Sequence, residues 1–292
     1  MYHLIFSILI IFGTLKDTFG DLEGVKDDEL IELIRNEKYL IVLFTQKNCE
    51  ECINLENELI GLREVLVEEL DAWVVKVENS QMTRLYSPPG KEPILVFFRH
   101  GIPLLYYGSP NEEEILHTFT YNKEPISKEL TDETFEHLTQ AATGATTGDW
   151  FVMFYTSDCI DCQRLQAIWE AVGAKVKESR VNIARVNRAT TGAATARRFN
   201  IYDVPTFILF RRGNMYRYRF QKYDFDSLAL FAKDSFRNMK AEKIPLPKTP
   251  FDDLVALIAV YMKDYPWLWP VGVGILCIII LDILRRIIMS NR

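Results

Sequence analysis

The chain has 292 residues, which is enough for two domains of ordinary size and leaves little for a third. With 48% hydrophobic and 25% charged residues, its composition excludes a collagen-like, low-complexity or wholly disordered protein. The formal net charge of −6 argues against a general nucleic-acid binder. Four of the five cysteines form two Cys-x-x-Cys pairs, Cys49 with Cys52 and Cys159 with Cys162, so these pairs are the first candidates for function.

Residues 1–20 have the pattern of a secretory signal peptide. Leu4 to Phe12 form a mostly apolar run of nine residues, too short to span a bilayer but of the length of a signal-peptide core. Thr18-Phe19-Gly20 offers small residues at −3 and −1 and predicts cleavage before Asp21. The basic segment that usually opens such a peptide is missing, so an uncleaved anchor or a buried N-terminal helix is the alternative.

A repeated pattern follows and predicts two related domains, at 21–120 and 128–240. A short aliphatic and aromatic run, typical of a buried strand, precedes each cysteine pair. An amphipathic helix is predicted after each pair. The predicted strands are 39–44 and 150–155, and the predicted helices are 52–70 and 162–176.

Each copy then continues with a strand, a strand led by proline, a further strand and a final helix. In the first copy these segments are 72–77, 91–101, 104–107 and 112–120, and in the second they are 181–186, 203–213, 215–220 and 224–239. From the second cysteine to the proline is 41 residues in one copy and 43 in the other, a spacing that chance rarely preserves. A further helix at 190–199 is clear only in the second copy, because Ser87-Pro88-Pro89-Gly90 breaks the pattern in the first. The order predicts an α/β fold in each domain, a mixed sheet with helices on both faces.

The C-terminal part of the chain predicts a membrane anchor. Residues 121–127 are expected to be a hinge between the domains, and 241–265 a Pro-rich juxtamembrane linker. The almost continuously apolar segment 266–284 would reach about 28 Å as a helix, close to the hydrocarbon thickness of a bilayer. The basic residues that follow it predict that 285–292 is a cytosolic tail and that the bulk of the protein faces the lumen or the exterior.

Charge is divided unevenly between the two predicted domains. Residues 21–120 carry 20 acidic and 9 basic side chains, whereas residues 121–248 carry 15 and 20, which leaves about −11 and +5. Nine arginines fall between Arg180 and Arg219. We interpret them as a solvated face, with docking against the acidic domain as a further possibility, because a lumenal protein meets no nucleic acid.

A strand, a Cys-x-x-Cys pair at the start of a helix and a later proline before a strand resemble the thioredoxin fold. Two such units, a signal peptide and one C-terminal span resemble a membrane-anchored member of the protein disulfide isomerase family, similar to the thioredoxin-related transmembrane proteins. The resemblance covers about residues 25–240, and its most specific part is the second copy, with Glu129 to Phe135, Cys159-Ile-Asp-Cys162 and Asp203-Val-Pro-Thr206. It implies two tandem thioredoxin-like domains followed by a single transmembrane helix.

The resemblance also implies roles for particular residues. In the second copy it makes Cys159 the attacking thiol, Cys162 the resolving thiol and Val204-Pro205 the cis-proline bond beside them. In the first copy Cys49, Cys52 and Glu92-Pro93 take those places. The physical chemistry agrees, because unpaired N–H groups at a helix N-terminus favour a thiolate and two intervening residues bring both sulfurs within one turn. A cis-proline would expose a backbone edge on which an extended client could pair.

Departures from the family predict a weak oxidant. The oxidising members carry Gly-His between the cysteines, whereas this chain has Glu50-Glu51 and Ile160-Asp161. A carboxylate about 6 Å from the sulfur opposes its ionisation by roughly 0.7 kcal/mol in water, or ~3 kcal/mol at an effective dielectric constant of 20. A less stable thiolate lowers the reduction potential of the disulfide. Leu43 and Met153 stand where family members place a buried carboxylate, so we expect slow proton transfer to the resolving thiol.

Three functions remain open from the sequence. The first is a thiol–disulfide oxidoreductase of the secretory pathway that acts on client proteins, with the Cys159 pair as its main centre and the Cys49 pair as its second. The second is a chaperone or binding module with idle cysteine pairs. The third, a four-cysteine zinc site, is disfavoured because the pairs lie 107 residues apart, far beyond the ~15–20 of a zinc ribbon. We therefore expect no metal, no cofactor and no nucleic-acid partner, and a single-pass type I protein of the endoplasmic reticulum membrane.

Overall fold

The computed structural model describes residues 21–87, 91–144 and 148–247, together with Val255, Ile258, Ala259, Met262, Tyr265, Pro270 and Ile280. Residues up to Pro245 belong to one compact unit and those from Leu246 onward to a second. The predicted signal peptide lies outside the described residues, and so does the predicted membrane span at 266–284 apart from Pro270 and Ile280. Within the part of the chain that is described, no helix is long and apolar enough to cross a membrane.

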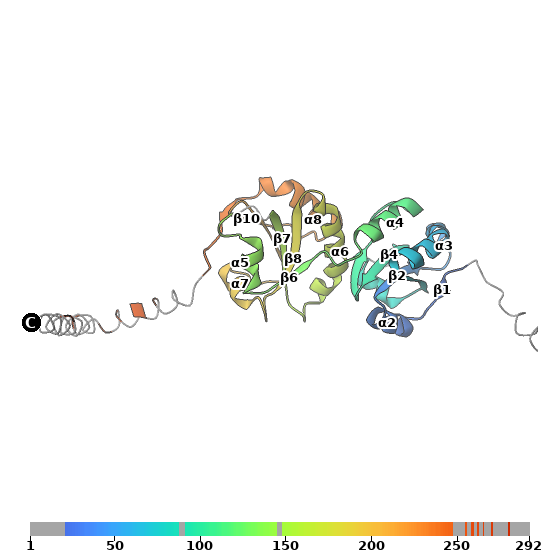
Figure 1. The fold of residues 1–292 in the computed structure, drawn as a ribbon, viewed down its shortest axis with the longest axis horizontal. Coiled ribbons are helices and arrows are strands. Elements are labelled where there is room, and N and C mark those ends of the chain that lie inside the picture. The colour runs from blue at the N-terminus through green and yellow to red at the C-terminus, as the bar shows by residue number, and fades with distance from the viewer. Residues whose placement is uncertain are drawn as a thin grey trace, which may run out of the picture. The chain divides into compact units, whose positions relative to one another are not determined.

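The first domain is built on a five-stranded mixed sheet (Figure 1). Its strands, in spatial order, are β1 (Glu23–Gly24), β3 (Trp73–Glu78), β2 (Tyr39–Thr45), β4 (Ile94–Arg99) and β5 (Ile102–Leu105). The first three run parallel, and β4 and β5 are antiparallel to their neighbours. The helices are α2 (Asp27–Asn36), α3 (Glu50–Leu70), α4 (Glu112–Tyr121) and the 3₁₀ helix η1 (Gln81–Leu85).

Strand β2 shows why this segment is almost entirely apolar. All seven of its residues are buried. Because successive side chains of a strand point to opposite faces, Ile41 and Leu43 pack in one core with Leu59 of α3, while Val42 and Phe44 pack in another with Leu30 of α2. A central strand covered by helices on both faces has no polar side, which explains its continuous hydrophobic sequence.

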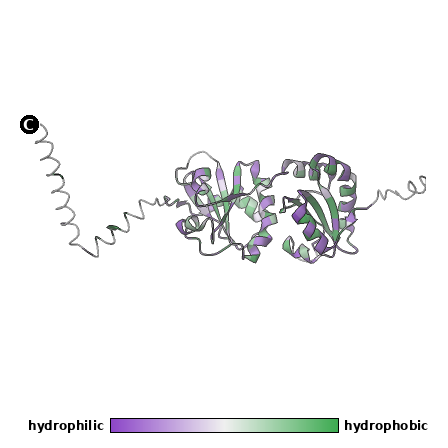
Figure 2. Ribbon diagram, turned by 60° about the horizontal axis from the view of Figure 1, so that its bottom comes forward, coloured by the Kyte–Doolittle hydropathy of each residue, from purple (hydrophilic) through white to green (hydrophobic). Residues whose placement is uncertain are grey.

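The second domain repeats the plan with six strands. Their order is β11 (Glu242–Lys243), β10 (Asn214–Arg217), β9 (Thr206–Arg211), β7 (Asp149–Tyr155), β8 (Val181–Asn187) and β6 (Lys128–Leu130). The helices are α5 (Thr134–Thr139), α6 (Ile160–Lys177), α7 (Ala193–Arg198), α8 (Phe225–Lys233) and the 3₁₀ helix η2 (Ser235–Asn238). Hydrophobic residues concentrate in the central strands of each domain, and hydrophilic residues lie on the outer faces of the helices (Figure 2).

The structure adds elements that the repeat did not predict and shortens others. Each domain begins with an additional short strand and helix, β1 with α2 and β6 with α5. Strand β1 has only two residues, too few for a periodic pattern, and it is defined by pairing with the distant β3. The helix predicted at 190–199 is only α7, and the one predicted at 224–239 ends at Lys233 before η2.

Among the described residues, five of the nine arginines between Arg180 and Arg219 form ion pairs within their own domain. Arg185 pairs with Glu129 at 3.3 Å, Arg198 with Glu136 at 2.7 Å and Arg217 with Glu242 at 3.1 Å, while Arg211 contacts Asp149. These paired arginines therefore have their carboxylate partners inside the second domain and not in the acidic one. Three of these pairs join neighbouring strands of the same sheet, and the pair of Arg198 with Glu136 joins α7 to α5.

Helix α6 belongs to the cores of both domains. Trp169 and Val172 pack in the core of the second domain, whereas Ala167 and Ala171 pack against the sheet of the first. Glu170, 2% exposed, forms an ion pair of 2.7 Å with Arg99 of β4, which is completely buried. Two charges can be buried this deeply only when they are paired and hydrogen-bonded.

The segment 121–127, predicted as a hinge, is held by this ion pair. Arg99 Nη1 donates to the carbonyl oxygens of Asn122 at 3.0 Å and Glu124 at 3.1 Å. The Glu170 carboxylate accepts from the backbone N–H groups of Ile126 at 2.8 Å and Ser127 at 3.0 Å. The connection is thus fastened to both domains.

Candidate functional site

The first cysteine pair lies where the chain turns from β2 into α3. Cys49 is the N-cap residue of α3, and its Sγ accepts a hydrogen bond of 3.1 Å from the backbone N–H of Cys52. Asn48 precedes it in the left-handed region, at φ 58°, a conformation that asparagine adopts more readily than most residues. Cys49 and Cys52 form a disulfide with a Cα–Cα distance of 5.2 Å.

The second pair repeats this geometry at the start of α6. Cys159 is the N-cap residue, its Sγ accepts from the Cys162 N–H at 3.1 Å, and the two form a disulfide with a Cα–Cα distance of 5.2 Å. Cys52 and Cys162 are each 3% exposed, whereas Cys49 and Cys159 are only partly buried. At each pair the first cysteine is therefore partly accessible to a visiting molecule and the second is shielded.

The proline-led segments lie beside the cysteine pairs. The Glu92–Pro93 and Val204–Pro205 peptide bonds are both cis. The carbonyl oxygen of Glu92 lies 3.9 Å from Cys49 Sγ. In the second domain Thr206 pairs with Phe154 on β7, five residues before Cys159, which brings Val204 and Pro205 to the same end of the sheet as that cysteine.

Carboxylates stand close to both disulfides. Glu50 and Glu51 occupy the first turn of α3 and are exposed, and Asp161 occupies the first turn of α6. Asp161 pairs with Arg164 at 3.4 Å on the same exposed surface. Because water screens exposed charges, the unfavourable interaction of these carboxylates with a nearby thiolate should be close to the roughly 0.7 kcal/mol expected in water and well below the ~3 kcal/mol expected at a dielectric constant of 20.

The positions of Leu43 and Met153 are apolar core positions, 0% and 1% exposed. The sheet register places Lys76 next to Leu43 and Arg185 next to Met153. These cations pair with carboxylates that sequence reasoning missed, because the partners come from other elements. Lys76 bonds Glu56 of α3 at 2.7 Å, and burial raises the pKa of Glu56.

In the second domain the carboxylate that pairs with the cation Arg185 is Glu129 of β6. It pairs with Arg185 at 3.3 Å and accepts a hydrogen bond of 2.9 Å from the Tyr155 hydroxyl, and burial raises its pKa. A charged residue in an otherwise apolar strand was the available signal for Lys76 and Arg185. Their partners become visible only once the strand order is known.

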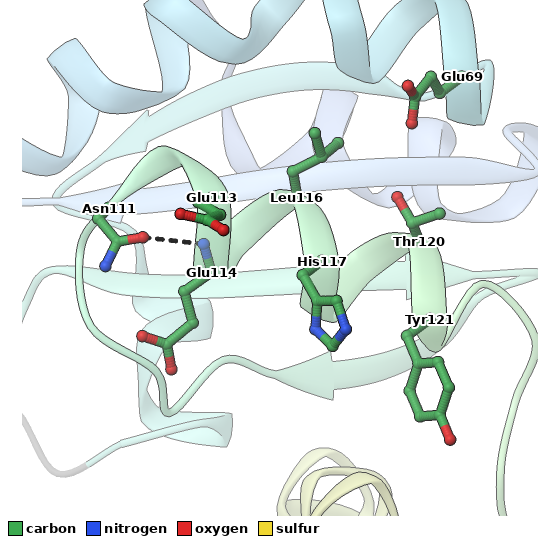
Figure 3. A pocket seen from close by; sticks show the side chains of 8 residues that line it. All are labelled: Glu69, Asn111, Glu113, Glu114, Leu116, His117, Thr120 and Tyr121. Atoms are coloured by element: carbon green, nitrogen blue, oxygen red, sulfur yellow. Dashed lines mark hydrogen bonds between the residues drawn. The ribbon is translucent and has the colours of Figure 1, made fainter.

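A separate hollow of about 680 Å³ lies over α4 and contains neither cysteine pair (Figure 3). Asn111 caps the helix by accepting from the Glu114 N–H at 2.8 Å. His117 stacks on Tyr121, with ring centroids 5.8 Å apart, and Lys177 lies 4.1 Å from the centre of the Tyr121 ring. These contacts are those of a packed helix surface, and we assign no chemistry to them. Among the described residues, no cluster of three or more His, Cys, Asp or Glu side chains has the arrangement of a metal site.

Comparison with known proteins identifies the same fold. The thioredoxin family model matches residues 126–233. A thioredoxin domain-containing protein of Theileria parva is 39% identical over 122 residues, covering 42% of this chain and 54% of the relative. Human thioredoxin-related transmembrane protein 1 is 30% identical over 116 residues, covering 40% of this chain and 36% of the relative. The chain thus spans about half of the first relative and about a third of the second.

A further relative is matched over most of its length. Protein disulfide-isomerase 5-1 of Arabidopsis thaliana is 30% identical over 118 residues, which are 40% of this chain and 77% of the relative. A solved structure of human ERp44 in a zinc-bound form covers 74% of this chain and 57% of its own, with 15% identity and a TM-score of 0.36. The two disulfides at helix N-termini and the match to most of the Arabidopsis protein show that this chain belongs to the protein disulfide isomerase family of thioredoxin-domain proteins.

Proposed function

We propose that the protein is a thiol–disulfide oxidoreductase that exchanges disulfides with client proteins. The observation that carries this proposal is that each disulfide caps a helix and joins a partly exposed cysteine to a buried one. This asymmetry supports an exchange in which the accessible sulfur meets the client and the shielded sulfur reacts only within the protein.

The reaction is a pair of thiolate displacements. In the reduced protein the Cys159 thiolate attacks one sulfur of a client disulfide, which forms a mixed disulfide and releases the other client sulfur as a thiolate. The Cys162 thiolate then attacks Cys159 Sγ, re-forms the Cys159–Cys162 disulfide and releases the second client thiolate. The client gains two electrons and the protein loses two, and the reverse sequence oxidises a client dithiol. Cys49 and Cys52 would perform the same steps in the first domain.

The backbone favours the attacking thiolate. The Cys162 N–H that points at Cys159 Sγ over 3.1 Å is one of the unpaired donors of the first helical turn. Together with the positive end of the helix dipole, such donors lower the pKa of a cysteine at this position. Glu50, Glu51 and Asp161 act in the opposite direction, and on this balance we propose a weak oxidant rather than a strong one.

Client backbone is proposed to pair beside the cysteines, at Glu92-Pro93 in the first domain and at Val204-Pro205 in the second. The support is the placement of Glu92 next to Cys49 and of Val204-Pro205 at the Cys159 end of its sheet. A client held in an extended conformation there would present its sulfur to the exposed cysteine.

We propose that the protein is a single-pass type I protein of the endoplasmic reticulum membrane. The support is the sequence of residues 1–20 and 266–284 and the similarity to a thioredoxin-related transmembrane protein. The measurement is a carbonate extraction of microsomes combined with protease digestion. Both cysteine pairs should stay protected until the membrane is permeabilised, and extraction into the carbonate supernatant would contradict an integral anchor.

An alternative is a chaperone or binding module with idle cysteine pairs. It is favoured by the apolar side chains of Leu43 and Met153, which cannot transfer protons. The two functions are separated by a trapping experiment.

In the trapping experiment Cys162→Ala is expressed and mixed disulfides with clients are sought on non-reducing gels. Because the resolving thiol is missing, we expect covalent complexes that disappear on reduction and that are lost when Cys159 is also replaced. Cys52→Ala with and without Cys49→Ala gives the same test for the first domain. A folded Cys162→Ala protein that captures nothing would favour the binding module.

A further inference from the structure

A groove of about 680 Å³ runs beside the first disulfide, and nothing of the chain described above fills it. We call it the Glu92 groove. Its chief lining residues come from three places, the first turns of α3, the segment leading into β4 and the residue after β5: Glu51, Leu55, Lys91, Glu92, Pro93 and Tyr106. Neither cysteine lines the groove, but Glu92 does, and its carbonyl oxygen lies 3.9 Å from Cys49 Sγ, so a chain whose sulfur reached Cys49 has the groove within reach of its neighbouring residues.

The groove has an apolar floor and an acidic rim. Leu55 is 5% exposed, while Glu51 is exposed at the start of α3, one residue from Glu50. Lys91 contributes one positive charge, which leaves the lining residues with one more carboxylate than cations. The groove also belongs to the domain with the net charge of about −11, counted from 20 acidic and 9 basic residues. A cation approaching it therefore meets a favourable field at long and at short range.

The side chain of Glu92 gives a second, independent indication that the groove binds a cation. Its Oε2 atom is shielded from solvent and has no hydrogen-bond partner among the described residues. A buried carboxylate oxygen without a donor is unfavourable, because it has lost water and gained nothing in exchange. If the Glu92 side chain turned its carboxylate towards a lysine ammonium or an arginine guanidinium bound in the groove, the new hydrogen bond would remove that penalty.

The second site differs at the equivalent positions. Val204 stands where the first domain has Glu92, and Ile160, 62% exposed, stands where it has Glu50. Tyr202, two residues before Val204, has 73% of its surface exposed. Asp161 at this site already has a cationic partner, Arg164. The two sites thus present different chemistry to a client.

We propose that the Glu92 groove binds the client segment beside the cysteine that Cys49 attacks, and that it selects segments carrying lysine or arginine. This inference rests on the proposed exchange function of the first disulfide. In the selected reaction the reduced Cys49 thiolate displaces one sulfur of the client disulfide, and Cys52 then closes the protein disulfide and releases the client as a dithiol. The two electrons pass to the client, and the basic residues change neither the bonds made nor the bonds broken.

The test uses the full chain in detergent with the second site silenced by Cys159→Ala and Cys162→Ala. Three synthetic peptides with the same disulfide-closed loop are flanked by two lysines, two glutamines or two glutamates. The reduced protein is mixed with each peptide, the reaction is quenched with acid, and the reduced peptide is quantified by mass spectrometry. At low salt we expect the lysine peptide to react about five- to tenfold faster than the glutamine peptide and the glutamate peptide to react more slowly, with the differences falling in high salt.

Three substitutions test which side chains cause the preference for the lysine peptide. Glu92→Gln and Glu51→Gln should each bring the lysine-to-glutamine ratio towards one, and Lys91→Gln should increase it. Glu64→Gln is the matched control, because it removes the same charge from an exposed position of α3 that does not line the groove. The ratio between peptides is the readout because changes in the intrinsic reactivity of Cys49 cancel in it.

The outcomes separate the inference from the function on which it rests. If no peptide is reduced by a folded protein, the exchange function of the first site fails and the inference fails with it. If all three peptides react at similar rates, or if Glu64→Gln lowers the ratio as much as Glu92→Gln, exchange stands and the groove is not a selective site. Val204→Glu in a protein with only the second site active gives an independent check, since it should raise the preference of that site for the lysine peptide.

Discussion

Cys49 and Cys159 each occupy the last position before a helix, where a side-chain acceptor is most useful to the unpaired N–H groups of the first turn. Each sulfur takes the place of the serine or aspartate oxygen that usually caps a helix. The same donor that completes the cap in the disulfide form would stabilise a thiolate in the reduced form. One backbone N–H therefore serves both structure and reactivity at each site.

The effect of the Asp161 charge on the reduction potential of the Cys159 pair can be tested by a single substitution. Asp161→Asn removes a carboxylate that opposes ionisation of Cys159, so the reduced form becomes more stable and the reduction potential rises, by up to about 15 mV if the interaction is roughly 0.7 kcal/mol. The measurement is a glutathione redox titration of the Cys159 pair. Asp132→Asn is the control, since Asp132 caps the N–H groups of Ala194 and Thr195 in a different part of the domain.

The reduction potential of the unmodified protein tests the same effect of the carboxylates. We expect a value well below that of protein disulfide isomerase, about −180 mV, because the carboxylates counteract the helix. A potential as oxidising as that one would contradict the proposed weak oxidant.

At the scale of elements, the helices are fixed by their first turns as much as by their apolar faces. Asp224 caps α8 by accepting from the Ser227 N–H at 3.1 Å. Partial burial acts to raise the pKa of Asp224, but hydrogen bonds from Ser227 and from its own backbone, together with the charge of Lys222, outweigh it, and the pKa lies below its ordinary value of 3.8. The folded protein therefore holds the ionised carboxylate more strongly than the unfolded chain does.

Asp224→Ala should lower the free energy of unfolding by about 1 kcal/mol at pH 7, the usual effect of losing an N-cap. Because the folded pKa is depressed, the contribution of the charge is complete above the unfolded pKa and is lost as the pH falls through the folded pKa. Asp224→Asn keeps a capping oxygen but has no charge to lose. In urea denaturation between pH 2 and 7, the free energies of unfolding of Asp224→Asn and of the wild type should approach each other at low pH. A difference that stays constant with pH would contradict this interpretation.

At the scale of the whole first unit, the buried ion pair of Arg99 and Glu170 joins elements that are 71 residues apart. It lies between β4 of one domain and α6 of the other, and α6 carries the second disulfide at its start. Tyr107 and Phe225 add a stacked contact between the domains, with ring centroids 4.2 Å apart. The helix of the second redox site is therefore packed on both sides.

Arg99→Met should destabilise the protein by about 3–5 kcal/mol, because it leaves the Glu170 charge buried without its cation. Glu170→Gln keeps the shape and one acceptor, and Arg99→Met combined with Glu170→Gln should be less destabilised than Arg99→Met alone. The measurement is urea denaturation of residues 21–245 for the two single variants and the double variant. Strictly additive effects would show that the two side chains are not energetically coupled.

Local patterns were sufficient to predict the core of each domain and both cysteine pairs. The apolar run of β2, the helical period after Cys52 and the proline before β4 are each signals carried by neighbouring residues. In both domains the structure confirms the predicted mixed sheet covered by helices. The predicted signal peptide and membrane span stay predictions, because they fall almost wholly outside the described residues.

Other features depended on distant partners and could not be predicted in this way. Strand β1 is defined only by its pairing with β3. Lys76 and Glu56 meet only because the fold packs α3 against β3. Segment 121–127 has a sequence typical of a hinge, yet it is fastened because Arg99 and Glu170 converge on its backbone.

The amino-acid sequence alone thus determined where the paired cysteines lie along the chain and which helices begin at them, since a helix start and a buried strand depend on residues a few positions apart. Only the tertiary structure decided which carboxylates and cations meet, how the two domains share α6, and that Glu92, which lines the groove beside Cys49, keeps one carboxylate oxygen buried without a donor. The physical reason is that burying a charge is favourable only with a partner, and these partners are brought together by the fold rather than by proximity in sequence.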